Sequence, residues 1–573
     1  MRAVDLLLHN AQIADLFRLR VIHGWVGVQD GRFLYVEPGE PPAEVVATKT
    51  RDLGGRFLVP GLVDAHMHIE SSLVTPRRFA QAALSHGTTA VLADPHEIAN
   101  VAGEAGVRWM IRASEGLPLR IYYAVPSCVP ATSPELEWTG AVFDADVVQR
   151  LADEPSVIAL GEVMDYRSVL AGDERLHRMV ETAHKARLLA EGHIPSLSGT
   201  ELSEYLAWGI GSDHTLTNPE KILEQTSKGL AVMLQAKSLL PENIAAVASL
   251  PDRSRILLVT DDIEPSLLVK GHLSRIVQEA IRMGMPPLEA LAAASLRPAW
   301  YLGLRELGAI APGRHADFLV MDAPGSFPPR EVFVGGRLVA ADGIAQSWES
   351  PALPPLPPAY PVPGPLRPDD FRLAPELAGS ASVIANAVVV QNELNTLTDL
   401  ERVVVQVAGG HVVLTERDDL ALAAVFARNS SSHTVGLIKN LGLRTGAFAS
   451  SFAHDSHNLL VIGRDPRSMA TAATAVYEMA GGVAIAHGSA VLARLALPIA
   501  GVITDAPLTD VARELTIIEQ RLRELGMRHQ RPFLLLSIMS LSVSPRYKFT
   551  DKGVVDVERR TLSAPYEDRP NEP

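Results

Sequence analysis

Residues 58–72 read LVPGLVDAHMHIESS, an apolar run that ends in two histidines with one residue between them. The run predicts a short buried strand, and Pro60-Gly61 marks its entry. Side chains two residues apart on a strand point to the same side, so His66 and His68 converge on one point. Such a pair is typical of a metal site, although a polar barrel interior is compatible with the same pattern. The presence of further ligands in the chain decides between the two interpretations.

The composition predicts a soluble protein with more than one domain. The chain has 573 residues, of which 47% are hydrophobic, and this length exceeds what one core accommodates. Its formal charge of -14 argues against a nucleic-acid partner, because binding a phosphate backbone needs a basic face. The single cysteine, Cys128, excludes an intramolecular disulfide and is typical of the reducing cytoplasm.

The N-terminal residues lack the apolar core of a signal peptide, because Asp5 interrupts them. No apolar run has the length needed to cross a bilayer. We therefore expect a cytoplasmic protein with no membrane partner.

Short β-rich runs flank a long middle part of the chain. Residues 21–28 and 32–36 are separated by the turn dipeptide Asp30-Gly31, and a comparable pattern returns at 316–321 and 332–339. We expect the two flanks, residues 1–56 and 306–350, to pair into one small β-sandwich into which everything between them is inserted.

The middle part, residues 57–305, alternates short apolar runs with helix-like segments. The clearest runs are residues 89–93, 121–125, 157–160 and 256–259. Strands that repeat with helical spacers over this length predict a (β/α)₈ TIM-like barrel. In such barrels the chemistry lies just past the carboxyl ends of the strands.

The proline-rich residues 351–368 predict an extended linker, because proline disfavours helix and ladder pairing. Residues 369–573 contain further strands and an alanine-rich helix over 467–479, so we expect a separate C-terminal α/β domain. The fold class is therefore α/β, with three structural parts.

Further metal ligands are available at later strand ends of the predicted barrel. In chain order they are Glu162, His193, His214 and Asp261. Four histidines, a carboxylate able to bridge and a terminal aspartate suffice for two divalent ions. Asp262 competes with Asp261, because neighbours on a strand face opposite sides, and the residue closer to the strand is favoured.

The stretch PGLVDAHMHIESSLVTP at residues 60–76 resembles the amidohydrolase superfamily, and its second half resembles the bacterial adenine deaminase family within it. More motifs of that family stand at residues 87–89, 94–100, 126–130, 161–164, 450–458 and 549–557. The resemblance extends over nearly the whole chain and includes the C-terminal domain.

This resemblance implies the hydrolysis of adenine to hypoxanthine and ammonia at two metal ions, manganese or iron. It implies that His66, His68 and Asp261 hold one ion. His193 and His214 would hold the other, with Glu162 bridging the two.

A mechanism follows from the chemistry of such a pair of ions. Water that bridges two divalent cations loses a proton near neutral pH, and the resulting hydroxide would attack C6 of the purine. We expect Asp261 to carry the proton of that water to the departing amine, and Glu97 to protonate a ring nitrogen. His96 and Ser72 are candidates for contacts with the substrate. His96 and Glu97 could instead cap the following helix or pair with each other.

Other functions stay open at this point. Thr215 and Ser196 depart from the family pattern, which favours an amidohydrolase acting on another aminated heterocycle or on a cyclic amide as the first alternative. The second alternative is a noncatalytic barrel that binds a purine. An acidic enzyme of this kind is expected to form a homodimer.

His454, Asp455 and His457 form a dense polar cluster in the C-terminal domain. They could reach the barrel mouth or bind a further metal. A local hydrogen-bonded turn is an equal alternative, because aspartate and serine readily form such turns.

Overall fold

The computed structural model describes residues 3–348, 352–357, 359–374, 376–377, 379–415 and 419–567. The chain forms two compact units. The first contains the chain through Asp94 together with Ile111–Val125 and Ala145–Leu353. The second contains Pro95–Met110, Pro126–Asp144 and the chain from Pro354 onward. Nothing in the sequence indicated that two segments of the predicted barrel range would group with the C-terminal residues.

In the first unit, the two flanks of the barrel contribute strands to one nine-stranded sheet. Its N-terminal strands are β1 (Val4–Asp15), β2 (Arg20–Gln29), β3 (Arg32–Pro38), β4 (Ala47–Asp52) and β5 (Phe57–Pro60). Its later strands are β15 (Phe318–Met321), β16 (Glu331–Val334), β17 (Arg337–Ala341) and β18 (Ile344–Ala345). The flanks meet where β5 pairs antiparallel with β15 and parallel with β1. The ring of Phe318 stacks on Phe333 and lies 6.0 Å from that of Phe33, so both flanks contribute to one core.

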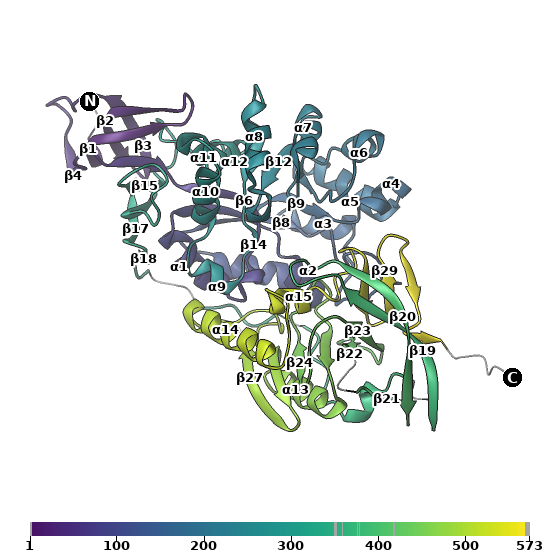
Figure 1. The fold of residues 1–573 in the computed structure, drawn as a ribbon. Helices are drawn as coiled ribbons and strands as arrows, with labels where there is room; N and C mark the ends of the chain where they lie inside the picture. Colours follow the sequence, from purple (N-terminus) through teal and green to yellow (C-terminus); the bar gives the residue numbers. More distant parts are fainter. Residues whose placement is uncertain are drawn as a thin grey trace. The chain divides into compact units, whose positions relative to one another are not determined.

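The barrel consists of parallel strands that alternate with helices along the chain, which confirms the predicted fold class (Figure 1). The strands are β6 (Leu62–His68), β7 (Thr88–Ala93), β8 (Arg120–Val125), β9 (Val157–Val163), β10 (Leu189–Gly192), β11 (Ser212–Asp213), β12 (Ala231–Leu234) and β13 (Ile256–Leu258). Strands β6 to β10 pair in chain order in one sheet, and β11 to β13 pair in chain order in another. Between the two sheets, the N–H of Gly211 donates to the carbonyl of Ala190. After β13, the short strand β14 (Asp261–Asp262) pairs parallel with β6 and returns the chain to the first strand.

Helices follow the barrel strands because their sequences carry one apolar face each. They are α1 (Pro76–Ser85), α3 (Ala145–Leu151), α4 (Tyr166–Ala171), α5 (Glu174–Lys185), α6 (Gly199–Leu206), α7 (Pro219–Ser227), α8 (Pro241–Ser249), α9 (Pro265–Leu268), α10 (Leu273–Arg282), α11 (Pro287–Ala293) and α12 (Leu296–Tyr301). In α5 the buried residues Leu176, Met179, Val180 and Ala183 recur at helical spacing. Asp173 begins that helix by accepting the N–H of Leu176, which satisfies a free donor of the first turn.

The apolar run that opens the barrel consists of two strands instead of the single predicted strand. Strand β5 belongs to the nine-stranded sheet and β6 to the barrel, and Gly61 separates them. A Cβ atom on Gly61 would lie 2.2 Å from Oγ1 of Thr89, so only glycine lets the chain pass between the two sheets at this point. Hydrophobicity alone does not reveal this division, because both strands are buried.

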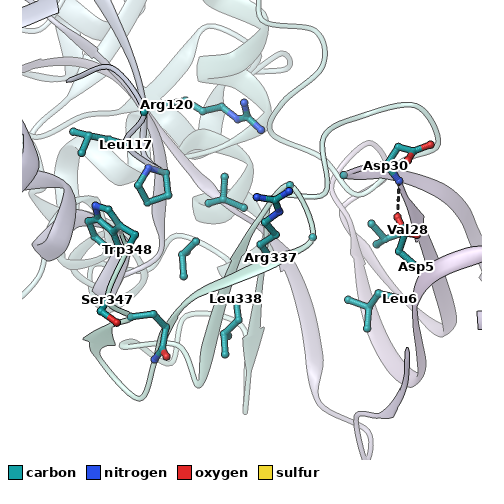
Figure 2. A pocket seen from close by; sticks show the side chains of 18 residues that line it. Asp5, Leu6, Val28, Asp30, Leu117, Arg120, Arg337, Leu338, Ser347 and Trp348 are labelled. Carbon is teal, nitrogen blue, oxygen red and sulfur yellow. Dashed lines mark hydrogen bonds between the residues drawn. The ribbon is translucent and has the colours of Figure 1, made fainter. Parts of the chain in front are cut away.

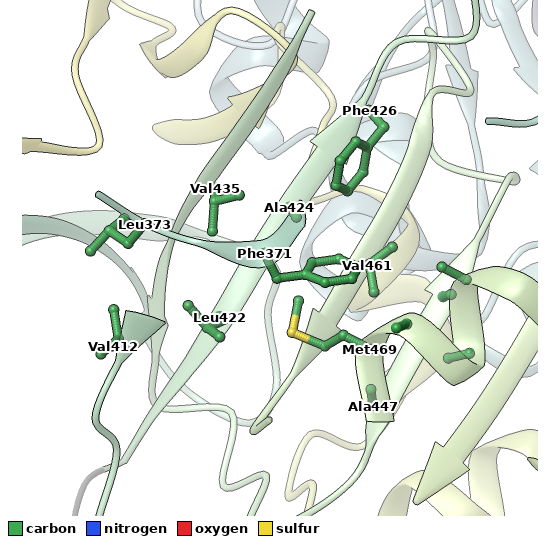
Figure 3. Packing of buried hydrophobic residues seen from close by; sticks show 14 of the residues in the cluster. Phe371, Leu373, Val412, Leu422, Ala424, Phe426, Val435, Ala447, Val461 and Met469 are labelled. Atoms are coloured by element: carbon green, nitrogen blue, oxygen red, sulfur yellow. The ribbon is translucent and has the colours of Figure 1, made fainter. Parts of the chain in front are cut away.

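The second unit is built on a ten-stranded sheet in the order β21-β20-β19-β23-β22-β25-β24-β26-β27, with β31 beside β19. The strands are β19 (Ser380–Val390), β20 (Thr398–Ala408), β21 (His411–Val412), β22 (Leu420–Phe426), β23 (His433–Lys439), β24 (Ala447–Ser450), β25 (Leu459–Gly463), β26 (Gly482–His487), β27 (Ala490–Ala496) and β31 (Tyr566–Glu567). Helix α13 (Pro466–Glu478), close to the predicted 467–479, contributes Met469 to a core that includes Phe371, Phe426 and Val461 (Figure 3).

The remaining elements of the second unit are α2 (His96–Ser114, whose last four residues belong to the first unit), α14 (Leu508–Glu524), α15 (Pro532–Ser537), and a small sheet of β28 (Tyr547–Thr550), β29 (Gly553–Asp556) and β30 (Thr561–Ser563). Within the predicted linker, residues 351 and 358 lie outside the described residues, and Val362 is buried in the core of this unit. None of the helices in the described ranges is long and apolar enough to span a bilayer.

Candidate metal centre

The six predicted ligands all lie at carboxyl ends of barrel strands in the first unit. His66 and His68 end β6, Glu162 lies in β9, His193 and His214 directly follow β10 and β11, and Asp261 begins β14. Five of them are at most 8% exposed, and the side chain of His193 is 24% exposed. The barrel topology therefore brings together residues that are far apart in the sequence.

Two hydrogen bonds orient the histidines of β6. Nδ1 of His68 lies 3.0 Å from the carbonyl oxygen of Asp94, and because a carbonyl only accepts, Nδ1 carries the proton. Nδ1 of His66 lies 3.0 Å from Oε2 of Glu191. Both contacts leave Nε2 for a metal, as is usual for histidine ligands. In the described part of the chain, the buried Nε2 of His66 has no hydrogen-bond partner.

The two oxygens of Glu162 face different groups of ligands. Oε1 lies 4.0 Å from Nε2 of His66 and 3.4 Å from Nε2 of His68. Oε2 lies 2.7 Å from Nδ1 of His193 and 3.2 Å from Nε2 of His214. Metal–ligand bonds of about 2.1 Å place neighbouring ligand atoms about 3 to 3.5 Å apart. Most of these spacings suit cations better than direct hydrogen bonds, and a carboxylate facing both groups is arranged to bridge them.

Asp261 joins the first group. Its Oδ1 lies 3.9 Å from Nε2 of His66 and 3.4 Å from Nε2 of His68. Its backbone adopts a φ of 57°, which non-glycine residues rarely use and which costs energy that the surroundings must offset. Asp262 is exposed, and its Oδ1 accepts the hydroxyl of Ser71.

The charges of the cluster attract a cation. Burial lowers the pKa of His66 to about 3, so its imidazole is neutral and able to bind a metal. Burial also disfavours the charged form of His214, but the negative charges of Glu162 and Asp261 outweigh it and raise the pKa to about 9. The carboxylates thus hold a proton on an imidazole, and a divalent ion can take the place of that positive charge.

Glu191 is a member of this site that the sequence analysis missed. It is fully buried, and burial raises the pKa of its carboxyl well above the usual value. The available signal was its position in β10, two residues before the predicted ligand His193. Asp94 has a similar supporting role, because its Oδ2 accepts the backbone N–H of Glu162 at 3.1 Å.

The predicted substrate contact Ser72 and the two departures from the family pattern have local partners in the first unit. Ser72 is buried and donates its hydroxyl to the carbonyl of Ile69 at 2.5 Å. Thr215 donates to Oδ1 of Asp213 at 2.9 Å, and Ser196 lies 3.0 Å from the hydroxyl of Tyr166. Their roles toward a substrate stay predictions.

The other predicted catalytic residue, Glu97, belongs to the second unit and is buried there. Its Oε1 lies 2.6 Å from Nδ1 of His454, and its Oε2 forms a short contact with Nε2 of His457. Burial would raise the pKa of Glu97, but its interactions with His454 and His457 outweigh burial and hold the pKa well below its usual value. His96 lies beside it, with Nε2 3.8 Å from Oε1. The sequence analysis selected these residues separately and did not indicate their contact.

A cavity of about 790 Å³ in the first unit is separate from the predicted ligand cluster (Figure 2). Asp5, Arg120, Arg337 and Trp348 are among the residues that line it, and none of the six predicted ligands is. Figure 2 shows the hydrogen bond from the N–H of Asp30 to Asp5 at one side of it. The predicted ligands therefore do not belong to this cavity.

Comparison with known proteins identifies the family. The model of the amidohydrolase family matches residues 57–339, and that of the adenine deaminase C-terminal domain matches residues 395–561. The chain is 40% identical to the adenine deaminase of Desulfatibacillum aliphaticivorans, over 96% of this chain and 95% of that protein. It is 39% identical to the adenine deaminase of Nitratidesulfovibrio vulgaris strain Hildenborough, over 98% and 96%.

A third relative, adenine deaminase 2 of Carboxydothermus hydrogenoformans, is 38% identical over 97% of this chain and 96% of that protein. These matches extend through both units, and in the first unit His66 and Glu162 form a buried group with His214 that could hold a metal ion. The chain therefore belongs to the adenine deaminase family of the metal-dependent amidohydrolases.

Proposed function

We propose that this protein hydrolyses adenine to hypoxanthine and ammonia with the help of two divalent metal ions. The observation that carries the proposal is the placement of Glu162, whose two oxygens face two separate groups of ligand atoms. The relatives named adenine deaminase support adenine as the substrate.

The donor atoms fit manganese or iron. His66, His68 and Asp261 would hold one ion, His193 and His214 the other, and Glu162 would bridge them. These donors are imidazole nitrogens and carboxylate oxygens without a thiolate, a set that suits Mn²⁺ or Fe²⁺. Hydrogen bonds from Nδ1 of His66 to Glu191 and from Nδ1 of His68 to the carbonyl of Asp94 would keep both imidazoles in the metal-binding tautomer.

The bound ions supply one piece of chemistry, which is the activation of a water molecule at neutral pH for attack on C6 of the purine. Asp261 takes a proton from that water and donates it to the departing amine, because its carboxylate lies beside both histidines of β6. The burial of these side chains keeps bulk water away from the reacting atoms.

Glu97 acts as the second proton-transfer group, which protonates a ring nitrogen of the purine as the tetrahedral centre forms. His96 and Ser72 contact the substrate. We further propose that the protein is a homodimer in the cytoplasm, in keeping with its acidic charge and single cysteine.

The test is the release of ammonia by protein that has been stripped of metal and reloaded with Mn²⁺ or Fe²⁺. We expect activity with adenine, none from the metal-free protein, and full activity at two ions per chain. Guanine and cytosine serve as alternative amines, and ring opening of hydantoin or dihydroorotate tests the cyclic-amide alternative. Reloaded protein that binds adenine but releases no ammonia would establish the noncatalytic alternative instead.

A further inference from the structure

In the second unit, the carboxylate of Glu97 lies between two histidines of the loop that connects β24 to β25. Nδ1 of His454 lies 2.6 Å from Oε1, and Nε2 of His457 contacts Oε2. All three residues are at most 6% exposed. Both contacts have hydrogen-bond lengths, which are too short for two separate ligands of one metal ion.

The protonation of His457 follows from its second nitrogen. The backbone N–H of Ala453 donates to Nδ1 of His457 at 3.1 Å, so Nδ1 carries no proton. Nε2 must then carry it and donate it to Glu97. Burial lowers the pKa of His457, which keeps this imidazole neutral. His457 is therefore a fixed donor.

The surroundings of His454 differ, because this imidazole lies between two carboxylates. Besides Glu97, Oδ1 of Asp455 lies 3.6 Å from its Nδ1. In the described residues, Oδ2 of Asp455 is buried without a hydrogen-bond partner. Two negative neighbours favour the protonated imidazole, which makes His454 the cation of this cluster.

Among the described residues, charged groups near the cluster include His96, Glu137 and Arg428. His96 is 3.8 Å from Glu97, and Glu137 acts on Asp455 only through space. Nε of Arg428 donates to the carbonyl of His457, and its other nitrogens donate to carbonyls including that of Ser451, so it holds the loop. None of these groups offers a proton to Glu97 at hydrogen-bond distance.

We propose that His454 supplies the proton that Glu97 delivers to the purine ring, while His457 holds Glu97 in position. The inference rests on the proposed function and names the proton source of the same reaction. A proton moves from Nδ1 of His454 to Oε1 of Glu97 and from there to a ring nitrogen, where it stays in hypoxanthine. The attacking water carries two protons. One leaves with ammonia through Asp261. The other passes to solvent, and solvent returns one proton to His454. His454 and His457 are thus positioning residues that act through Glu97.

Two matched substitutions test this division. His454→Asn places an amide N–H where Nδ1 was, and His457→Gln places one where Nε2 was. Both variants therefore keep an N–H beside Glu97, but neither N–H supplies a transferable proton. We expect His454→Asn to lower kcat by about 100-fold with little change in KM, and to remove the alkaline limb of the kcat profile against pH. His457→Gln should lower kcat by about tenfold at most and keep that limb. The exposed His433, whose Nδ1 lies 3.1 Å from the carbonyl of Ser431, gives the control His433→Asn with unchanged kcat.

A second measurement keeps the inference testable if the His454→Asn variant does not fold correctly. Added imidazole should restore part of the activity of His454→Ala, which a merely structural role of His454 would not allow. Equal effects of the two matched variants with an unchanged pH profile would overturn the inference. So would the loss of one metal equivalent from His454→Asn, which would assign Glu97, His454 and Asp455 to a cation. A wild-type protein without activity in the presence of Mn²⁺ would instead refute the proposed function itself.

Discussion

The two units each contain a buried cluster of histidines around a carboxylate, and the clusters differ in spacing. Around Glu162 in the first unit, three of the four imidazole nitrogens lie 3.2 to 4.0 Å from its oxygens. Around Glu97 in the second unit, one histidine lies at 2.6 Å and the other closer still. The first spacing leaves room for ions between Glu162 and the imidazoles, whereas the contacts of Glu97 with His454 and His457 are short enough for hydrogen bonds.

The second nitrogen of each imidazole explains this difference. In the first cluster Glu191 and the carbonyl of Asp94 bind the outer nitrogens and direct unprotonated nitrogens toward the carboxylates. In the second cluster the N–H of Ala453 binds the outer nitrogen of His457 and directs a protonated nitrogen toward Glu97. A histidine thus serves as a metal ligand or as a proton donor depending on which group binds the nitrogen that faces away from the carboxylate.

The largest expected effect tests the metal assignment of the first cluster. Glu162→Gln removes the charge that faces both groups of ligands while it keeps the side-chain volume. We expect kcat to fall by at least about 10³-fold and the metal content to drop below two ions per chain. Ammonia release and elemental analysis of the purified variant check both. A variant that keeps two ions and normal turnover would contradict the bridging role of Glu162.

A smaller effect is expected from the group that orients His66. Glu191→Gln keeps an oxygen that can accept from Nδ1 of His66 but removes the ionisable carboxyl group, whose charged form a cation bound nearby would favour. The affinity for the more weakly bound ion should fall by about 10- to 100-fold, which titration of metal-free protein with Mn²⁺ measures. Saturating Mn²⁺ should restore most of the activity. Unchanged affinity would mean that Glu191 only fills space.

A pH experiment tests whether the buried carboxyl group of Glu137, in the second unit, stays protonated in the folded protein. Burial raises the pKa of Glu137 to about 7, although Ser542 and Thr132 donate hydrogen bonds to it. Between about pH 4.5 and 7 the folded state therefore keeps a proton that the unfolded state has released. This group then lowers stability as pH rises, by up to about 1.4 kcal/mol per pH unit, and has no further effect above pH 7.

Glu137→Gln removes this pH dependence. We expect the variant to gain stability relative to the wild type as the pH rises from 5 to 7, which unfolding in denaturant at several pH values measures. A difference that is constant across this range would contradict the assignment.

The smallest effect compares the scaffolds of the two units. Asp173 begins α5 and Asp465 begins α13, and each accepts the N–H of the residue three positions on. Asp173→Ala and Asp465→Ala should each lower the free energy of unfolding by about 1 kcal/mol, with no change in kcat. Thermal unfolding and ammonia release check this. A large loss of activity in either variant would mean that the clusters depend on these helix starts.

Several features could be predicted from the sequence because they depend on local patterns. Alternating apolar runs and helical spacers predicted the barrel, and the pattern at residues 466–478 predicted α13 almost to the residue. The spacing of His66 and His68 on one strand predicted that both face one point, and the rule that barrel chemistry lies at strand ends selected the other four ligands. Other features had no local signal. The division at Gly61 depends on the side chain of Thr89, and the support from Glu191 depends on how β10 lies relative to β6.

The sequence by itself determined the order of strands and helices, the family and the identity of the candidate ligands, because these follow from residue types and short spacings. Only the tertiary structure decided that residues 95–110 and 126–144 group with the C-terminal residues and that Glu97 meets His454 and His457. Such contacts join residues 360 positions apart, and no periodicity along the chain encodes them. The tertiary structure also decided which nitrogen of each histidine is available, because a distant carbonyl, carboxylate or N–H binds the other one.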